Sequence, residues 1–138
     1  MGKLIAGHVV VPGRAEGSAL VANEPISFWG GYDYKTGEIT DRRHKLSGES
    51  AAGKVLAVPF TRGSSTTTAV LLEALRNGTA PAGIITTGVD TFFALACIVS
   101  EVMYNSTIPV IAVSRESFTL LKSGNHLSIS EDGEIRLS

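Results

Sequence analysis

The feature that most constrains the fold is the alternation of short apolar runs and longer helical patterns in the second half of the chain. The apolar runs at 54–59, 82–86 and 108–113 are flanked by turn residues, which is typical of buried strands. Between them, residues 66–77 and 91–104 have the length and apolar spacing of helices. Successive strand–helix–strand units of this kind predict a parallel core sheet.

The rest of the chain is rich in strand and turn signals. We expect strands at 4–11, 17–22 and 25–29, a turn at 35–37, a short helix within 114–121, and a hairpin formed by 126–130 and 134–137. The first-half strands would be antiparallel and would extend or close the parallel core. The fold class is therefore α/β, with a mixed sheet flanked by helices.

Composition limits the function classes. A chain of 138 residues with 43% hydrophobic and 18% charged residues predicts one globular domain over 1–138. The net charge of −1, with scattered Lys and Arg, gives no basic footprint for nucleic acid or acidic membranes. The N-terminus lacks the pattern of a signal peptide, and no apolar run approaches the roughly 20 residues of a membrane helix. We therefore expect a cytoplasmic protein.

The segment 59–68, Pro-Phe-Thr-Arg-Gly-Ser-Ser-Thr-Thr-Thr, is the strongest candidate for chemistry. It runs from a predicted buried strand, through Gly63, into a cluster of hydroxyl residues at a predicted helix start. The first amides of a helix lack partners within the helix, and the helix dipole places partial positive charge there. An anion such as a carboxylate or an alkoxide is stabilised at such a position.

Two interpretations of these serines stay open at this point. Ser64 or Ser65 could only cap the helix, because serine is a favoured N-cap residue. Alternatively, one of them is a base or a substrate ligand, and five consecutive hydroxyl residues exceed what one cap needs. A Ser–His–Asp hydrolase is disfavoured, because Thr66 follows the serines where the nucleophile elbow requires glycine.

Other candidates carry weaker signals. The aromatic segment 25–33, which ends in Asp33, is equally compatible with core packing and with a wall of the site. His44 lies in a charged run typical of a solvated loop, and a binding role is the alternative. Asp90 is placed to cap the second helix. Cys97, the only cysteine, is expected to be a buried, inert thiol, and it cannot form a metal site alone.

Several of these motifs together resemble one known family. Pro-Ile-Ser-Phe-Trp-Gly-Gly at 25–31, Thr-Gly at 36–37, His44, Gly-Lys at 53–54, Arg-Gly-Ser-Ser at 62–65, Ala-Pro-Ala at 80–82 and Ile-Pro-Val at 108–110 occur in its order and spacing. The chain, over roughly residues 3–137, is similar to the small subunit, or swivel domain, of the aconitase X family. The combination of Arg-Gly-Ser and Phe-Trp-Gly-Gly carries this resemblance.

The resemblance implies a swivelling β/β/α fold, a barrel-like mixed sheet flanked by helices. It also implies a hydro-lyase in which Ser64 removes a proton next to a carboxylate, with Gly63 and Ser65 contacting the substrate. Motif alignment alone favours Ser64 over Ser65. In ordinary aconitase the matching motif ends in arginine, whereas Thr66 stands here, so that arginine contact is not carried over.

The same resemblance implies a cofactor and a partner. A large subunit would hold an iron–sulfur cluster through its own cysteines, and this chain would be inactive without it. The favoured substrate is cis-3-hydroxy-L-proline, and phosphomevalonate is the alternative. The roles of His44, Asp33 and Asp90 are left open by the motif.

Two other classes compete with this interpretation. A phosphohistidine carrier domain shares the swivelling fold but needs a histidine where this chain has Asp90-Thr91-Phe92. A non-catalytic binding module would be favoured if a Ser64→Ala change left the assembled enzyme fully active.

Overall fold

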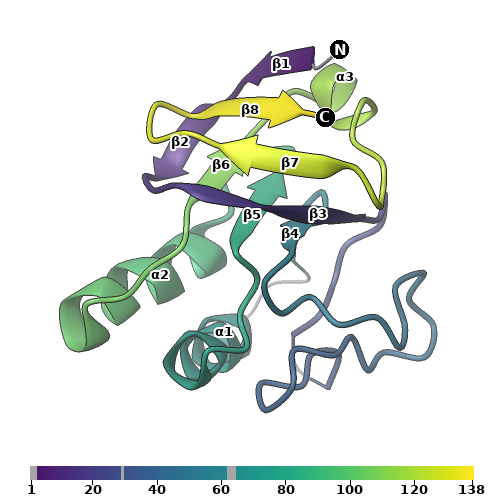
Figure 1. The fold of residues 1–138 in the computed structure, drawn as a ribbon. Coiled ribbons are helices and arrows are strands. Elements are labelled where there is room, and N and C mark those ends of the chain that lie inside the picture. Colours follow the sequence, from purple (N-terminus) through teal and green to yellow (C-terminus); the bar gives the residue numbers. More distant parts are fainter. Residues whose placement is uncertain (1–2, 29, 62–64) are drawn as a thin grey trace.

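The computed structural model describes residues 3–28, 30–61 and 65–138, with the side chain of Ser65 left out. Within these residues it forms one eight-stranded sheet and three helices (Figure 1). The strands are β1 (Lys3–Ala6), β2 (His8–Val11), β3 (Ala15–Val21), β4 (Val55–Ala57), β5 (Gly83–Thr86), β6 (Val110–Ala112), β7 (His126–Ile129) and β8 (Glu134–Leu137). The helices are α1 (Ser65–Asn77), α2 (Thr91–Tyr104) and α3 (Arg115–Phe118).

The strand–helix–strand pattern correctly predicts that β4, β5 and β6 are parallel. The expectation that the first-half strands are antiparallel was wrong for β3, which pairs parallel with β4, because the long connection 22–54 allows the crossover that a parallel pair needs. The full order is β1-β8-β7-β3-β4-β5-β6-β2, in which β3, β4, β5 and β6 run parallel and the remaining pairs are antiparallel. Helices α1 and α2 connect the parallel strands and pack against each other (Figure 1). The antiparallel strands of both chain ends complete the sheet.

Gly7 turns the sheet into a nearly closed barrel. The strands at the two ends of the order, β1 and β2, are consecutive in the chain and are separated by this one residue. The N–H of Gly7 donates to the carbonyl of Gly133 at 3.0 Å. A Cβ at position 7 would lie 2.2 Å from Cγ2 of Ile111, so the bend needs a residue without a side chain. Residues 4–11, expected to form a single strand, therefore belong to two strands, one at each end of the sheet order.

The parallel strands separate two apolar cores. Alternate residues of a strand point to opposite faces, so Val55 and Ala57 of β4 fill the barrel while Leu56 faces the helices. The barrel core also takes residues from the hairpin and from α3, among them Leu127 and Phe118. The second core lies under α1 and α2.

Helix boundaries follow local chemistry. Asp90 is the N-cap of α2 and accepts hydrogen bonds from the amides of Phe92 and Phe93. Asn105, in the left-handed conformation at φ 53°, ends this helix. Gly78, at φ 75°, follows α1 and stops it as expected. No helix among the described residues has both the length and the apolar character needed to cross a membrane.

The connection between β3 and β4 differs from the prediction. Residues 25–29 do not form a strand: in the described part of this segment, a single bridge joins Ile26 to Thr61. Here the apolar side chains pack one by one into the core, and their backbone does not form a continuous set of strand-pairing hydrogen bonds. Phe28 stacks on Tyr32 at 4.5 Å between ring centroids and meets Phe93 edge-on at 5.3 Å. The expected turn at 35–37 is present, with Gly37 at φ 85°.

Candidate functional site

The chain leaving β4 is anchored on both sides before it reaches the serine motif. Val58 donates its N–H to the carbonyl of Ile85 at 3.1 Å. The carbonyl of Pro59 accepts from both the N–H and the hydroxyl of Thr87 at 3.1 Å, and that of Phe60 accepts from Ile26 N–H at 3.3 Å. The backbone is thus fixed up to Thr61, the last described residue before Ser65 begins α1.

Asp90 holds the end of this segment against the start of α2. Its Oδ2 accepts hydrogen bonds from the N–H of Thr61 at 2.8 Å and from the hydroxyl of Thr61 at 2.7 Å. Its Oδ1 accepts from the amides of Phe92 and Phe93, each at 3.1 Å. Both Asp90 and Thr61 are buried. The expected cap is confirmed, and the same carboxylate also ties α2 to the segment that leads into the serines.

The starts of α1 and α2 meet at one edge of the sheet. Each helix follows the carboxyl end of a parallel strand, β4 or β5, and these strands are neighbours. The hydroxyl of Thr68 in α1 donates to the carbonyl of Phe92 in α2 at 3.0 Å. Two helix N-termini at the carboxyl edge of a parallel sheet favour an anionic ligand in that region.

Not every predicted site residue falls within the described part of the chain. Gly63 and Ser64 lie outside the described residues, and only the backbone of Ser65 is placed, as the first residue of α1. Their roles therefore stay predictions. Within the hydroxyl cluster, Thr67 is buried at 1% exposure and Thr68 bonds to α2, so these two hydroxyl residues have structural uses.

The structure assigns local bonding to two residues whose roles the motif left open. His44 is 6% exposed, and its Nδ1 accepts from the N–H of Leu46 at 3.1 Å, although its neighbours in the charged run are exposed as expected. Its Nε2 lies 3.7 Å from a carboxylate oxygen of Glu24. Asp33 accepts from the N–H of Lys35 at 2.8 Å and shapes the turn at 35–37. The expectation of a solvated loop was wrong for the His44 ring.

The aromatic segment is core where it is described. Phe28 and Tyr32 are buried, and the Tyr32 hydroxyl donates to the carbonyl of Thr79 at 2.9 Å. Burial raises the pKa of Tyr32 well above its ordinary value. Trp29 lies outside the described residues, so a site-lining role for that ring stays a prediction.

A basic hollow of about 760 Å³ adjoins the anchored segment. Pro59 and Phe60 form part of its wall, and its charged lining residues, Lys45, Arg115 and Lys122, are all positive. The hollow lies beside the carboxyl ends of β3, β4 and β5, through Val21, Pro59 and Thr87. Sequence reasoning missed Arg115 and Lys122 because no spacing links them to residue 45; only the fold brings them together.

The described residues offer no group of three or more His, Cys, Asp or Glu side chains placed to hold a metal ion. Cys97 is fully buried, as expected. Burial raises the pKa of its thiol to about 11, against smaller opposing effects of hydrogen bonds with Thr107 and Ile108. This thiol is therefore neutral and inert near pH 7.

A family model described as the aconitase X swivel domain matches residues 4–137. The chain belongs to this family. A crystal structure of Thermococcus kodakaraensis aconitase X in its holo-form superposes with a TM-score of 0.87 at 33% identity, covering 99% of this chain and 98% of that one. The mixed barrel with flanking helices is thus the swivel domain of aconitase X.

Curated relatives carry two kinds of name. The cis-3-hydroxy-L-proline dehydratase of Pseudomonas aeruginosa is 42% identical over 107 residues, which are 78% of this chain and 18% of that protein. The phosphomevalonate dehydratase small subunit of Thermococcus gammatolerans is 36% identical over 134 residues, which are 96% of each chain. This swivel domain spans about a fifth of the length of the hydroxyproline dehydratases and nearly all of the small subunits.

Proposed function

We propose that this swivel domain is the small subunit of a hydro-lyase and supplies the serine base at a site shared with a large subunit. The anchored segment 58–61, held by Asp90, is the observation that supports this proposal. It ends at Thr61, which directly precedes the Arg-Gly-Ser-Ser motif in the sequence and is bonded to the N-cap of α2. The family match over residues 4–137 supports the reaction class.

In this proposal Ser64 acts as the base, and Gly63 and Ser65 contact the substrate. The ionised Ser64 oxygen takes a proton from the carbon next to a carboxylate. The electron pair of that C–H bond forms the double bond as the C–O bond breaks and hydroxide departs. The hydroxide takes a proton from solvent to become water, and Ser64 returns its proton to solvent. A serine hydroxyl is a poor base at neutral pH, so helix-start amides and exclusion of water must stabilise its alkoxide.

The cofactor and partner are part of the same proposal. An iron–sulfur cluster supplies Lewis-acid chemistry for a departing hydroxyl. The described part of this chain does not fit such a cluster, since its lone cysteine is buried and no ligand group is assembled. We therefore place the cluster in a large subunit, and we expect the small subunit alone to be inactive and the complex to be cytoplasmic.

The favoured substrate is cis-3-hydroxy-L-proline, the compound named in the 42% identical relative. A specific observation supports phosphomevalonate as the second candidate. The basic hollow presents Lys45, Arg115 and Lys122 beside Pro59 and Phe60 of the anchored segment, and phosphate groups are bound by such cations. The relatives that match this chain along nearly their whole length also carry the phosphomevalonate dehydratase name.

The test is a dehydration assay of the assembled enzyme. This chain is co-expressed with the aconitase X large subunit of the same genome, purified without oxygen, and supplied with each substrate in turn. We expect one substrate to turn over and Ser64→Ala to reduce kcat at least a thousandfold with the complex intact, whereas Ser65→Ala should chiefly raise KM. Activity that survives Ser64→Ala would remove Ser64 as base and favour a non-catalytic module.

The basic hollow gives a matched substrate control. Replacing both Arg115 and Lys122 with Gln should raise KM for phosphomevalonate by at least tenfold, because a phosphate loses two charged contacts. The same double variant should leave KM for cis-3-hydroxy-L-proline within about twofold, since that substrate has no phosphate. An equal change in KM for both substrates would show that the hollow does not bind the phosphate group.

A further inference from the structure

Helix α2 has an apolar face that stays exposed among the residues that the structure describes. Its buried side consists of Phe93, Ala96, Cys97 and Ser100. On the opposite side, Leu95 and Ile98 are each 52% exposed and Val102 is 81% exposed. We call Leu95, Ile98 and Val102 the α2 stripe. Their spacing of three and four residues aligns them on one face of the helix.

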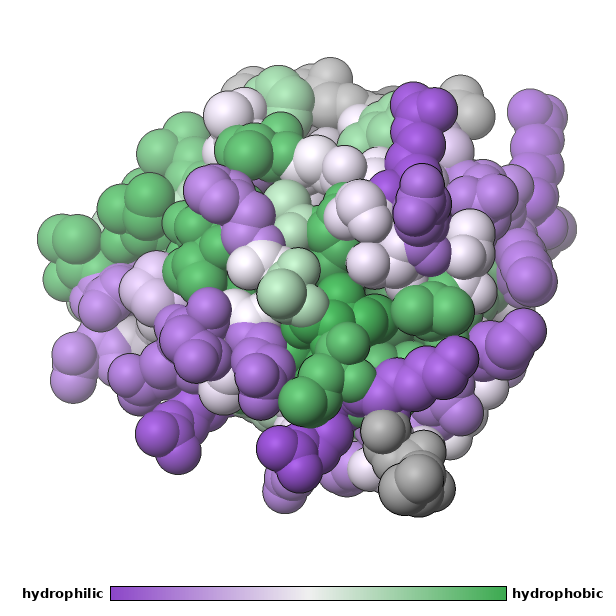
Figure 2. Space-filling view, turned by 90° about the horizontal axis from the view of Figure 1, so that it is seen from above, coloured by the Kyte–Doolittle hydropathy of each residue, from purple (hydrophilic) through white to green (hydrophobic). Residues whose placement is uncertain are grey.

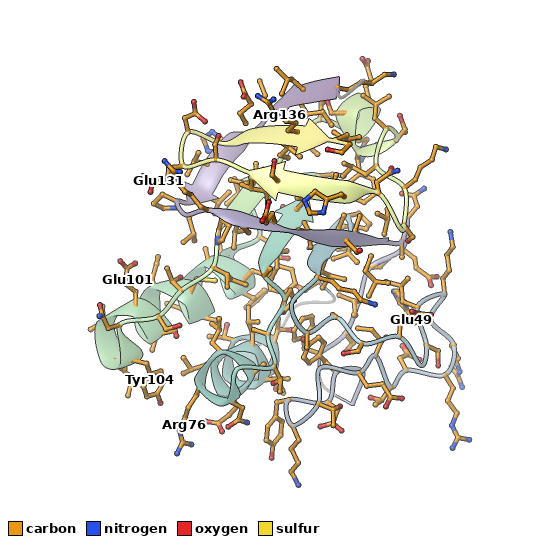
Figure 3. All side chains as sticks on the ribbon, in the orientation of Figure 1. Glu49, Arg76, Glu101, Tyr104, Glu131 and Arg136 are labelled. Carbon is orange, nitrogen blue, oxygen red and sulfur yellow. The ribbon has the colours of Figure 1, made fainter. Side chains whose placement is uncertain are left out.

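The outer face of α2 differs in polarity from that of the neighbouring helix. The neighbouring helix α1 presents the ion pair Glu73–Arg76 at 3.5 Å to solvent. Helix α2 carries a single charged residue, Glu101, near its C-terminal end, where Tyr104 is also labelled in Figure 3. Figure 2 shows hydrophobic side chains gathered at the left, the side on which α2 lies. A helix that is apolar all round is normally buried on both sides.

The stripe lies on the same helix as Asp90 of the candidate site. Asp90, which binds Thr61, is the N-cap of α2, and Val89 just before it is 60% exposed. From there the 14 residues of α2 run for about 21 Å, at roughly 1.5 Å per residue. A molecule that completes the site from this side would therefore also meet Val89 and then the stripe.

The occupant that fits is the large subunit. Relatives of nearly the same length are named small subunits, and in the hydroxyproline dehydratase the matched part is only 18% of a much longer chain. Both facts point to a larger body beside this domain. A second copy of this chain on the stripe would not account for the small-subunit names of these relatives.

We propose that the α2 stripe, with Val89, is the docking surface for the large subunit, which meets it with an apolar groove. This inference rests on the proposed function, because it uses the same partner. Contacts on the stripe position the small subunit through α2. The N-cap of the same helix, Asp90, also binds Thr61, which directly precedes the Arg-Gly-Ser-Ser motif in the sequence. Assembly and placement of the base are thereby linked through one helix.

The test measures binding of the purified small subunit to the aconitase X large subunit of the same genome. Ile98→Glu and Val102→Glu should each weaken binding at least a hundredfold, because a charge would be buried in an apolar contact. Leu4→Glu is the matched control: Leu4 is 57% exposed on β1, away from α2, and its substitution should change binding less than twofold (Figure 1). Because all three side chains are exposed, each free variant should keep the wild-type thermal midpoint within a few degrees.

The outcomes separate this inference from the proposed function. Loss of binding in both stripe variants with retention in Leu4→Glu supports the stripe, even if the complex dehydrates neither substrate. Unchanged binding in the stripe variants overturns it, even if the complex is active. A wild-type chain that dimerises through the stripe while the large subunit binds all variants equally also overturns it. Ser64→Ala should bind with wild-type affinity.

Discussion

Replacing Asp90 separates two tasks that one carboxylate performs. Its Oδ1 caps α2 through two backbone amides, and its Oδ2 binds the N–H and hydroxyl of Thr61. Asp90→Ala removes both sets. Asp90→Ser keeps a favoured N-cap residue but is too short to reach Thr61. The difference between the two variants therefore isolates the cap, and the remaining loss in Asp90→Ser isolates the tether.

The expected magnitudes follow from the burial of these groups. Losing a helix N-cap costs about 1 kcal/mol. Leaving the N–H of Thr61 without a partner costs about 2 kcal/mol, because Thr61 is only 6% exposed and water does not readily replace the carboxylate. We therefore expect Asp90→Ala to lower the free energy of unfolding by about 3 kcal/mol and Asp90→Ser by about 2 kcal/mol.

Urea unfolding measures the stability, and hydrogen exchange of the Thr61 amide measures the tether directly. Asp132→Ala is the matched control, because Asp132 also accepts bonds, from Ser130 and Glu134, but is exposed. That control should leave the urea midpoint close to that of wild type, because the side chain is exposed. In the assembled enzyme both Asp90 variants should lower kcat by roughly ten- to a hundredfold, because the anchored segment 58–61, which precedes the serine motif in the sequence, would be misplaced. A loss below about 1 kcal/mol in Asp90→Ala, with Thr61 exchange unchanged, would refute the reasoning.

Two further predictions concern stability. Gly7→Ala should lower the free energy of unfolding by about 1 to 3 kcal/mol in the same urea assay, because the new Cβ would lie 2.2 Å from Ile111 Cγ2. Gly88→Ala is the control: no heavy atom of the described residues, its chain neighbours aside, lies within 4 Å of its added Cβ, so the free energy of unfolding should change by less than about 0.5 kcal/mol. Because burial raises the pKa of the Cys97 thiol to about 11 from 9.0, the unfolded chain ionises first, and stability should fall between about pH 9 and 11. At pH 10.5 wild type should have lost about 2 kcal/mol more than Cys97→Ala relative to pH 7.5, and equal losses would contradict the burial of the thiol.

The sequence predicted most of the fold because the determining signals are local. Both long helices were placed within one residue of their ends, since Asn77-Gly78 and Asp90 mark those ends chemically. The parallel arrangement of β4, β5 and β6 followed from strand–helix–strand order, whereas the parallel pairing of β3 with β4 did not, because no helix connects them. The barrel closure could not be read in the same way, because it depends on pairing between β1 and β8 at opposite ends of the chain.

The candidate site was predictable only in part. The hydroxyl cluster after Gly63 stands out in the sequence, but the tether between Thr61 and Asp90 joins residues 29 positions apart. The third predicted strand, at 25–29, failed because its apolar residues pack singly against rings such as Phe93 instead of joining a ladder. Burial of His44 was missed because a charged run predicts solvent contact for all its members, whereas tertiary packing turned one ring inward.

The pairing of β1 with β8 has a consequence for synthesis of the protein. Lys3 lies opposite Leu137 and Ala6 opposite Glu134, so β1 is made well before the strand with which it pairs. During translation the helices and parallel strands can assemble while β1 still lacks its neighbour. The apolar lining of the barrel is then open to water and to other nascent chains until residues 134–137 have left the ribosome. Chaperone demand should therefore be highest in the interval after β1 is made and before β8 can pair with it.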